Sequence, residues 1–139
     1  RPTAVYGPGD ANQRVLYKFI TRALRGEPLR IDGDGSMALD FTYVDDTANG
    51  IFRVATMEAA KGETFNIARG KSETLSAAIS IISETIDDVK VEYRDVPDHI
   101  PKRGTLDITK ARKLIGFDPQ NDLEQALPTY IEHLRHNPI

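Results

Sequence analysis

The chain has 139 residues, of which 40% are hydrophobic and 28% are charged, so it can bury the core of one globular domain. Its formal net charge is −3 and it has no basic run, which argues against a nucleic-acid partner or an anionic membrane surface. It contains no cysteine, which excludes disulfides and thiolate metal sites and fits a reducing, cytoplasmic location. No apolar run approaches the ~20 residues that a membrane-spanning helix needs.

The chain starts with a predicted strand, a glycine turn and a helix. Residues 3–6 read as the strand, which the Gly-Pro-Gly turn at 7–9 ends. Asp10 or Asn12 can then cap a helix, because both side chains accept hydrogen bonds from free N–H groups. The apolar face of this helix consists of Val15, Leu16, Phe19, Ile20, Ala23 and Leu24. Residues 29–31 predict a short strand.

The central stretch of the chain, residues 33–50, reads GDGSMALDFTYVDDTANG and predicts a tight turn, a strand and a helix. Its glycines formally match a dinucleotide-binding fingerprint, but that motif needs a helix after the glycines and here a strand follows. One face of the strand carries Leu39, Phe41 and Tyr43, and the other carries Asp40, Thr42 and Val44. Asp45 and Asp46 stand where helix caps belong, which is favoured over a pair of catalytic carboxylates. The helix then carries Ala48, Ile51, Phe52 and Ala55 at helical spacing.

The second half of the chain continues the alternation of strands and helices. Strands are predicted at 64–68 and 89–93, with a helix between them that starts at Thr74. The inward residues of that helix are Leu75, Ala78, Ile79, Ile82 and Ile86. Residues 96–102 contain two prolines and predict a loop. Because strands alternate with helices throughout, the predicted fold class is α/β with parallel pairing.

Two aspartates predict the starts of the last helices. Asp107 caps a short helix through residue 115, and Asp122 starts a helix with Leu123, Ala126, Leu127, Tyr130, Ile131 and Leu134 inward. Pro128 lies inside that pattern, and an interior proline costs about 3 kcal/mol, so a kink or a restart is expected. His133 and His136 are too few ligands for a metal site, and a solvated helix end is expected instead.

Four stretches resemble, in the same order, motifs of one enzyme family. Residues 1–10 read RPTAVYGPGD, residues 33–46 read GDGSMALDFTYVDD, residues 64–70 read TFNIARG, and residues 101–119 read PKRGTLDITKARKLIGFDP. They resemble segments of the extended short-chain dehydrogenase/reductases, the NAD-dependent epimerases and dehydratases of nucleotide sugars. The resemblance spans almost the whole chain and covers only the C-terminal part of the family's sequence.

The resemblance implies a fold and a domain organisation. Residues 1–139 would form a single C-terminal substrate-binding segment, made of late sheet strands of a Rossmann-type extended short-chain dehydrogenase and a small α/β substrate lobe. The N-terminal NAD-binding part would be absent, since the chain opens at Arg1 in a strand-like stretch that looks like part of a longer protein. The implied partners are that Rossmann part and a nucleotide sugar, and self-association is expected through exposed strands.

The resemblance also implies the chemistry of the parent protein, which would be hydride transfer to NAD at a sugar carbon, followed by epimerisation or elimination. This chain has no glycine-rich cofactor loop, and none of its tyrosines is followed four residues later by lysine, so it would hold no catalytic residue. NAD is therefore expected in the parent chain and not on this segment, which would be inactive alone.

By resemblance, several residues would lie near the ligands of the parent enzyme. Pro2 and Thr3 would lie near the nicotinamide of the cofactor. Leu29 and Ile31 would line the site of the nucleotide base. Leu39 would lie in the substrate site, where many members of the family have an arginine that binds the diphosphate.

Two polar residues have both a functional and a structural interpretation. Asn66 matches an asparagine of the family's substrate site, although a structural hydrogen bond explains it equally well. Arg103 can present a planar fork of donors to a phosphate, and a solvated loop arginine is an equal alternative. No residue is predicted to bind a metal.

Two other functions remain open. The spelling R-P-x-x-V-Y-G-P-G-D, with Ala4 where many members have asparagine, also resembles relatives that reduce steroid or flavonoid ketones. In a different class, the domain would bind a ligand or a partner without catalysis, having kept the fold and lost the reaction. Intact G-x-x-G-x-x-G and Y-x-x-x-K motifs in the parent would favour an enzyme, and their loss would favour a binding module.

Overall fold

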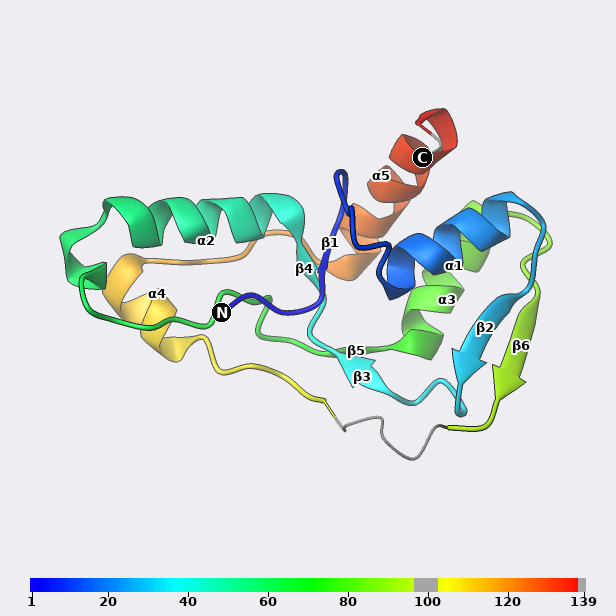
Figure 1. The fold of residues 1–139 in the computed structure, drawn as a ribbon, viewed down its shortest axis with the longest axis horizontal. Coiled ribbons are helices and arrows are strands. Elements are labelled where there is room, and N and C mark those ends of the chain that lie inside the picture. Colours follow the sequence, from blue (N-terminus) through cyan, green and yellow to red (C-terminus); the bar gives the residue numbers. More distant parts are fainter. Residues whose placement is uncertain (97–102, 138–139) are drawn as a thin grey trace.

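The computed structural model describes residues 1–96 and 103–137, so the loop expected at 96–102 lies outside it except for its first residue. The elements are β1 (Val5–Tyr6), α1 (Val15–Leu24), β2 (Leu29–Asp32), β3 (Ala38–Leu39), β4 (Thr42–Tyr43), α2 (Val44–Thr56), the 3-10 helix η1 (Glu58–Ala60), β5 (Glu73–Thr74), α3 (Leu75–Thr85), β6 (Val91–Arg94), α4 (Thr109–Ile115) and α5 (Leu123–His136). The described part is elongated, with α2 and α4 at one end and α1, α3, β2 and β6 at the other (Figure 1).

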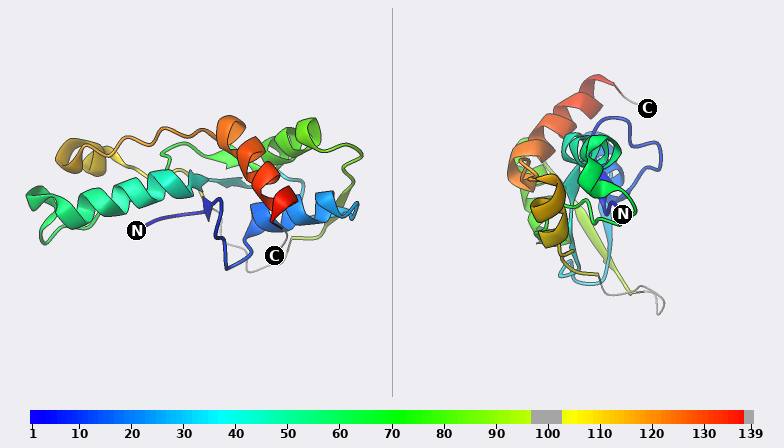
Figure 2. Two further views of the ribbon diagram at one scale, coloured as in Figure 1. Left: turned by 90° about the horizontal axis from the view of Figure 1, so that it is seen from above. Right: turned by 90° about the vertical axis from the view of Figure 1, so that its left-hand side faces the viewer.

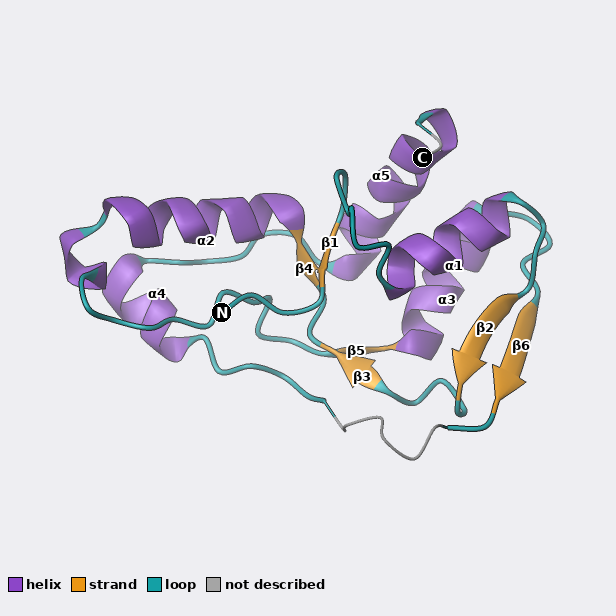
Figure 3. Ribbon diagram, in the orientation of Figure 1, coloured by secondary structure: helices purple, strands orange, loops and turns teal. Residues whose placement is uncertain are grey.

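The described strands form three separate pairs (Figure 3). β1 lies parallel to β4 and β2 lies parallel to β6, whereas β3 and β5 are antiparallel. Each parallel pair joins strands far apart in the sequence, as expected because parallel strands need a crossover connection. The predicted α/β class with parallel pairing is confirmed by the first two pairs.

The main hydrophobic core lies where α1, α3 and α5 pack together beside β2 and β4 (Figure 2). All the predicted inward residues of α5 are buried: Leu123, Ala126, Leu127, Tyr130, Ile131 and Leu134. At the start of α3, the Thr74 hydroxyl accepts the Ala77 N–H at 3.0 Å, so the predicted cap is confirmed. Of the kink or restart predicted at Pro128, the restart is wrong, because α5 continues through this residue as one helix, and the kink stays a prediction.

A second, smaller cluster fills the other end of the molecule, between α2, η1 and α4. Its buried residues are Ala60, Phe65, Ile67, Ala111, Ile115 and Phe117. Gly50 lies on the face of α2 that packs against this cluster. A Cβ at this position would clash with Ile67 and come within 3.0 Å of Phe117, so the close approach of α2 requires glycine.

The apolar stripe on α2 faces solvent. The predicted helix is present, but Ile51 is 55% exposed, Phe52 is 66% exposed, and Ala48 and Ala55 are exposed as well. The inward residues are instead Asp46, Thr47 and Gly50. A periodic pattern identifies residues that share a helix face, and it does not identify what covers that face.

The central strand is broken where the sequence predicts a continuous one. β3 pairs with β5, the chain then leaves the ladder at Asp40, and β4 pairs with β1. Both predicted faces contain buried residues, because Asp40 and Thr42 are buried as completely as Leu39. The glycine turn before it is confirmed, with strand β3 and no helix after the glycines.

The helix start after this strand is confirmed, but its capping by aspartates is wrong. Tyr43 is the N-terminal cap residue of α2, and no side chain caps the helix there. The Asp46 carboxylate instead accepts the N–H groups of Gln120 and Asn121, both at 2.9 Å. Asp46 therefore ties the first turn of α2 to the segment that precedes α5, a long-range contact that its position in the sequence does not reveal.

Two other predicted caps have partners close in sequence. Asp10 accepts the Arg14 N–H at 3.0 Å immediately before α1, and Asp107 accepts the Thr109 N–H at 2.8 Å at the first residue of α4. Asp122 is the N-terminal cap residue of α5 as predicted, although its side chain makes no capping hydrogen bond. Local sequence therefore predicts these helix starts well.

The predicted strands at 3–6 and 64–68 are much shorter in the structure. β1 keeps only the last two residues of the first, because Ala4 has a positive φ of 39°. The second is reduced to one parallel bridge between Ile67 and Pro2, with the Ile67 N–H donating to the Arg1 carbonyl at 3.1 Å. Residues 29–31 lie in β2 as predicted, and the strand predicted at 89–93 is β6, slightly later in the sequence.

Candidate functional site

A cavity of about 480 Å³ lies between α1, β2 and the β3–β4 segment, with Arg103 at its wall. Its lining residues are Ala4, Val5, Tyr6, Arg14, Val15, Leu16, Phe19, Arg30, Ile31, Asp32, Met37, Leu39, Phe41, Leu75 and Arg103. Most of them are apolar or aromatic, and several, such as Phe19, Ile31 and Phe41, belong to the main core, so the floor of the cavity is apolar. A mostly apolar cleft with a few charged groups is typical of a small-molecule site.

Three arginines, Arg14, Arg30 and Arg103, belong to this wall. Arg14 is partly fixed, because its Nη1 donates to the Val5 carbonyl at 3.1 Å. Arg30 lies 3.4 Å from Glu92 on the neighbouring strand β6. Guanidinium groups present planar donors that match phosphate oxygens, and three of them against the one carboxylate of Asp32 in the same wall favour an anion.

The structure brings together three of the residues predicted from the resemblance. Ile31, Leu39 and Arg103 all line the cavity, although they come from segments far apart in the sequence. Leu29, on the same strand as Ile31, is fully buried in the main core and does not line it.

The other predicted site residues lie elsewhere. The Asn66 side-chain amide donates to the Asp107 carbonyl at 2.9 Å, so this residue has the structural hydrogen bond that the sequence left open. Pro2 is exposed beside Ile67, Thr3 is half-buried next to it, and neither lines the cavity. Pro2, Thr3 and Asn66 would therefore need a second site or a larger protein to contact a ligand.

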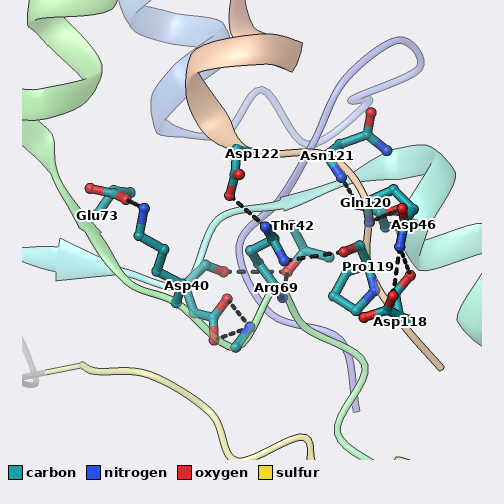
Figure 4. A network of polar contacts seen from close by, with 12 residues as sticks. Asp40, Thr42, Asp46, Arg69, Glu73, Asp118, Pro119, Gln120, Asn121 and Asp122 are labelled. Carbon is teal, nitrogen blue, oxygen red and sulfur yellow. Dashed lines mark hydrogen bonds and ion pairs between the residues drawn. The ribbon is translucent and has the colours of Figure 1, made fainter. Parts of the chain in front are cut away.

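A polar network lies behind the cavity wall, centred on the Asp40 carboxylate and the Arg69 guanidinium (Figure 4). Asp40 is 1% exposed and accepts the Gly70 N–H at 3.1 Å and the Leu106 N–H at 3.0 Å. Arg69 pairs with Asp122 at 2.6 Å and donates to the Pro119 carbonyl at 3.1 Å. The network thus connects the β3–β4 segment to two distant loops and to the start of α5.

Burial dominates the electrostatics of two groups near the wall. It raises the pKa of Asp40 above the ordinary value of 3.8, although the hydrogen bonds from Leu106 and Gly70 act in the opposite direction. Burial also raises the pKa of Tyr6, whose hydroxyl has no hydrogen-bond partner among the described residues. A general acid/base needs a pKa near the working pH, so Tyr6 is not suited to that role.

Sequence reasoning missed Arg14, Arg30 and the network residues Asp40 and Arg69. Arg14 stands just before the apolar face of α1, and Arg30 alternates outward along β2, so each looks like an ordinary solvated residue. Only the packing of α1 over β2 brings both to one cavity. No local signal identifies them, because the cavity is formed by non-local contacts.

Two absences concern the part of the chain that the structure describes. Residues 1–96 and 103–137 contain no group of three or more metal-ligating side chains placed to share an ion. Within the same residues, no helix has the length and hydropathy to cross a bilayer. His136, one of the two histidines that the sequence raised as possible metal ligands, has a local neighbour: its Nδ1 lies 2.9 Å from the Glu132 carbonyl in the last turns of α5.

Residues 1–68 match the model of the NAD-dependent epimerase/dehydratase family. The chain is 35% identical over 133 residues to UDP-glucuronic acid decarboxylase 4 of Arabidopsis thaliana, covering 94% of this chain and 30% of that protein. It is 31% identical over 135 residues to UDP-glucuronate 4-epimerase of Thermodesulfobacterium geofontis (strain OPF15), covering 96% and 41%.

A solved structure has the same fold. UDP-glucuronic acid 4-epimerase from Bacillus cereus, in complex with UDP-glucuronic acid and NAD, superposes with a TM-score of 0.92 at 26% identity. The superposition covers 99% of this chain and 44% of that one. The chain therefore spans less than half the length of the relatives it matches, and its fold is that of part of a Rossmann-type enzyme.

Proposed function

This chain belongs to the NAD-dependent epimerase/dehydratase family, and from that premise we propose that it is the nucleotide-sugar-binding part of an NAD-dependent epimerase, decarboxylase or dehydratase. The observation that carries the proposal is the cavity, where an apolar floor meets three guanidinium groups. Family members named for UDP-sugar chemistry align with nearly the whole chain. In this proposal, residues 1–139 are one C-terminal substrate-binding segment.

The cavity offers separate surfaces to the two halves of a nucleotide diphosphate. Ile31 and Phe19 would provide apolar contacts for a base, and Leu29, on the same face of β2 as Ile31, belongs to the buried core beside it. Arg14 and Arg103 would neutralise the diphosphate, as charge-assisted hydrogen bonds are roughly twice as strong as neutral ones. Asn66 would act on the substrate only indirectly, through the segment that contains Asp107.

The reaction itself needs more than these residues. Bound NAD would supply the hydride acceptor and donor, and Pro2 and Thr3 are proposed to lie near its nicotinamide. No helix of the described residues follows a G-x-x-G-x-x-G turn, so a cofactor pyrophosphate has no such cradle in that part of the chain. We therefore propose that the chain alone is inactive and that NAD binds mainly to a further, N-terminal Rossmann part.

Two features support that partner. The exposed stripe on α2, with Ile51 and Phe52, is apolar on a helix whose opposite face already packs on a core. An exposed apolar stripe of this kind is typical of a surface that another part of the protein covers. The bridge between Pro2 and Ile67 lies outside the named strands, so its backbone edges could pair with further strands. We propose that these edges promote self-association where no Rossmann part covers them. The lack of cysteine supports a reducing, cytoplasmic location.

One observation favours a second candidate, a ketone reductase of the same superfamily. Leu39 lines the cavity wall as an apolar residue, where many family members place an arginine for the diphosphate. A substrate without phosphates would suit that change. A non-catalytic ligand-binding domain would be the third possibility, if the full protein lacked the catalytic pair.

Calorimetry on the pure chain tests the proposal by comparing UDP-glucuronic acid, UDP and uridine. Binding of the first two, with much weaker binding of uridine, is expected because the arginines contact the diphosphate. Absence of binding by all three would refute nucleotide-sugar recognition. A parallel incubation with NAD(H) should give no turnover, and reproducible turnover by the pure chain would refute its inactivity.

A further inference from the structure

We propose that Asp40 is a positioning residue that holds Arg103 in the cavity wall, so that a buried carboxylate behind the cavity controls anion binding inside it. The proposal rests on the function proposed above. Asp40 does not line the cavity, but its neighbours Leu39 and Phe41 both do. Its carboxylate therefore lies directly behind the wall that a ligand would touch.

The Asp40 carboxylate joins three segments of the chain. It belongs to the β3–β4 segment, it accepts the Gly70 N–H at 3.1 Å with each oxygen, and its Oδ2 accepts the Leu106 N–H at 3.0 Å. Leu106 follows Arg103 by three residues. The bond to Leu106 thus fixes the backbone close to the guanidinium that faces the cavity.

A second tie holds the same segment. The Thr105 hydroxyl accepts the Ser72 N–H at 3.2 Å and lies 2.7 Å from the Ser72 hydroxyl. Gly70 approaches the segment closely, because a Cβ there would come within 2.8 Å of Ile108. Residues 69–72 and 103–108 therefore run side by side, with the Asp40 carboxylate at their junction.

Arg103 itself depends on this anchoring. Arg103 is exposed. Within residues 1–96 and 103–137, its guanidinium makes no hydrogen bond or ion pair that would hold the side chain in place. Its place in the wall is set by its backbone, which Asp40 holds three residues away. A carboxylate suits this task because it only accepts, whereas an amide would turn one donor toward a backbone N–H.

A double-mutant cycle tests the proposal with UDP as the probe and calorimetry as the readout. Arg103→Ala should weaken binding by about tenfold, and Asp40→Asn should weaken it by about three- to tenfold in the native sequence. In the Arg103→Ala background, Asp40→Asn should change the affinity by less than about twofold, because residues that act through one another are not additive. Equal effects in both backgrounds would overturn the proposal.

Asp46→Asn is the matched control. Asp46 is also a buried carboxylate, 5% exposed, that accepts two backbone N–H groups, but its partners Gln120 and Asn121 lie outside the Arg103 segment. It should lower the melting temperature and leave UDP affinity unchanged in both backgrounds. A loss of affinity in Asp46→Asn equal to that in Asp40→Asn would mean that general destabilisation explains both.

Two further measurements test the proposal even if Asp40→Asn folds poorly or the native chain does not bind UDP. Thr105→Val removes the second tie without burying a charge, and it should show a smaller loss that again disappears with Arg103→Ala. Amide hydrogen exchange needs no ligand: Asp40→Asn should speed exchange at Leu106 and its neighbours, and unchanged exchange there would overturn the anchoring. Absence of UDP binding by the native chain would refute the proposed function, while exchange would still decide whether Asp40 holds the segment.

Discussion

Replacement of Arg103 by alanine should weaken the binding of UDP or a UDP-sugar while leaving the fold intact. Arg103 lines the cavity and belongs to neither hydrophobic cluster, so truncation removes charge and donors without opening a core. The neighbouring backbone remains held by Asp40 and by the Ser72–Thr105 contact. The expected change is therefore in affinity and not in melting temperature.

The size of the effect follows from the exposure of the side chain. A hydrogen bond to a charged group contributes about 1.5–3 kcal/mol, which corresponds to roughly ten- to a hundredfold in affinity. Arg103 is exposed, and solvent screening reduces the contribution of such a group. The loss should therefore lie near the lower end of that range, and it should shrink as salt is added.

Calorimetry at two salt concentrations provides the assay, with two companion variants. Arg103→Lys should recover only part of the affinity, because an ammonium cannot reproduce a bidentate fork. Arg135→Ala is the control, since Arg135 lies on α5, does not line the cavity, and makes only long contacts, to Glu132 at 3.6 Å and to the Thr85 carbonyl at 3.5 Å. Unchanged affinity in Arg103→Ala would return Arg103 to an ordinary surface position and would favour a substrate without a diphosphate.

Three other outcomes can be measured on the chain alone. Burial raises the pKa of Asp40 above its ordinary value of 3.8, so the native state binds this proton more tightly than the unfolded chain does. The stabilisation from the bound proton should be complete below pH 3.8 and should be lost as the pH rises through the pKa of the native state. Urea titrations of the native chain and Asp40→Asn across that interval should show their difference falling with pH, and a growing difference would refute the sign. Gly50→Ala should destabilise by about 1–3 kcal/mol in thermal or urea unfolding, because the new methyl group meets Ile67 and Phe117; an unchanged or higher stability would show that the helix shifts freely. Light scattering should show association that grows with concentration and weakens in Phe52→Asp, whereas a monomer at every concentration would contradict an uncovered α2 face.

The sequence predicts most helices of this protein because their signals are local. Thr74 caps α3 within its own first turn, and Gly116 ends α4 in the left-handed conformation that glycine favours. The buried face of α5 follows from its apolar spacing alone. These features need no knowledge of the rest of the chain, and all three are present in the structure.

The features that local patterns do not predict are those set by distant partners. Asp46 looks like a helix cap, yet its carboxylate oxygens accept hydrogen bonds from a segment more than seventy residues away. The apolar stripe of α2 looks like a core face, yet the core lies on the side of Gly50. The residues of the candidate site divide in the same way: the resemblance to the family points to Ile31, Leu39 and Arg103, and only the fold adds Arg14 and Arg30 to them.

Leu39 is weaker evidence for a ketone reductase over a nucleotide-sugar enzyme than the sequence alone implies. Read alone, the loss of an arginine at that position argues against a diphosphate. In the fold, the same cavity has Arg14 and Arg103 in its wall, with Arg14 partly fixed by the Val5 carbonyl. Three guanidinium groups and one carboxylate, that of Asp32, line the wall, so it keeps a positive charge that an uncharged ketone would not need. Covering guanidinium groups with an apolar ligand would cost their hydration. The charge of the cavity thus supports the proposed nucleotide-sugar substrate, and under that proposal Leu39 would change how a diphosphate is held and would not exclude one.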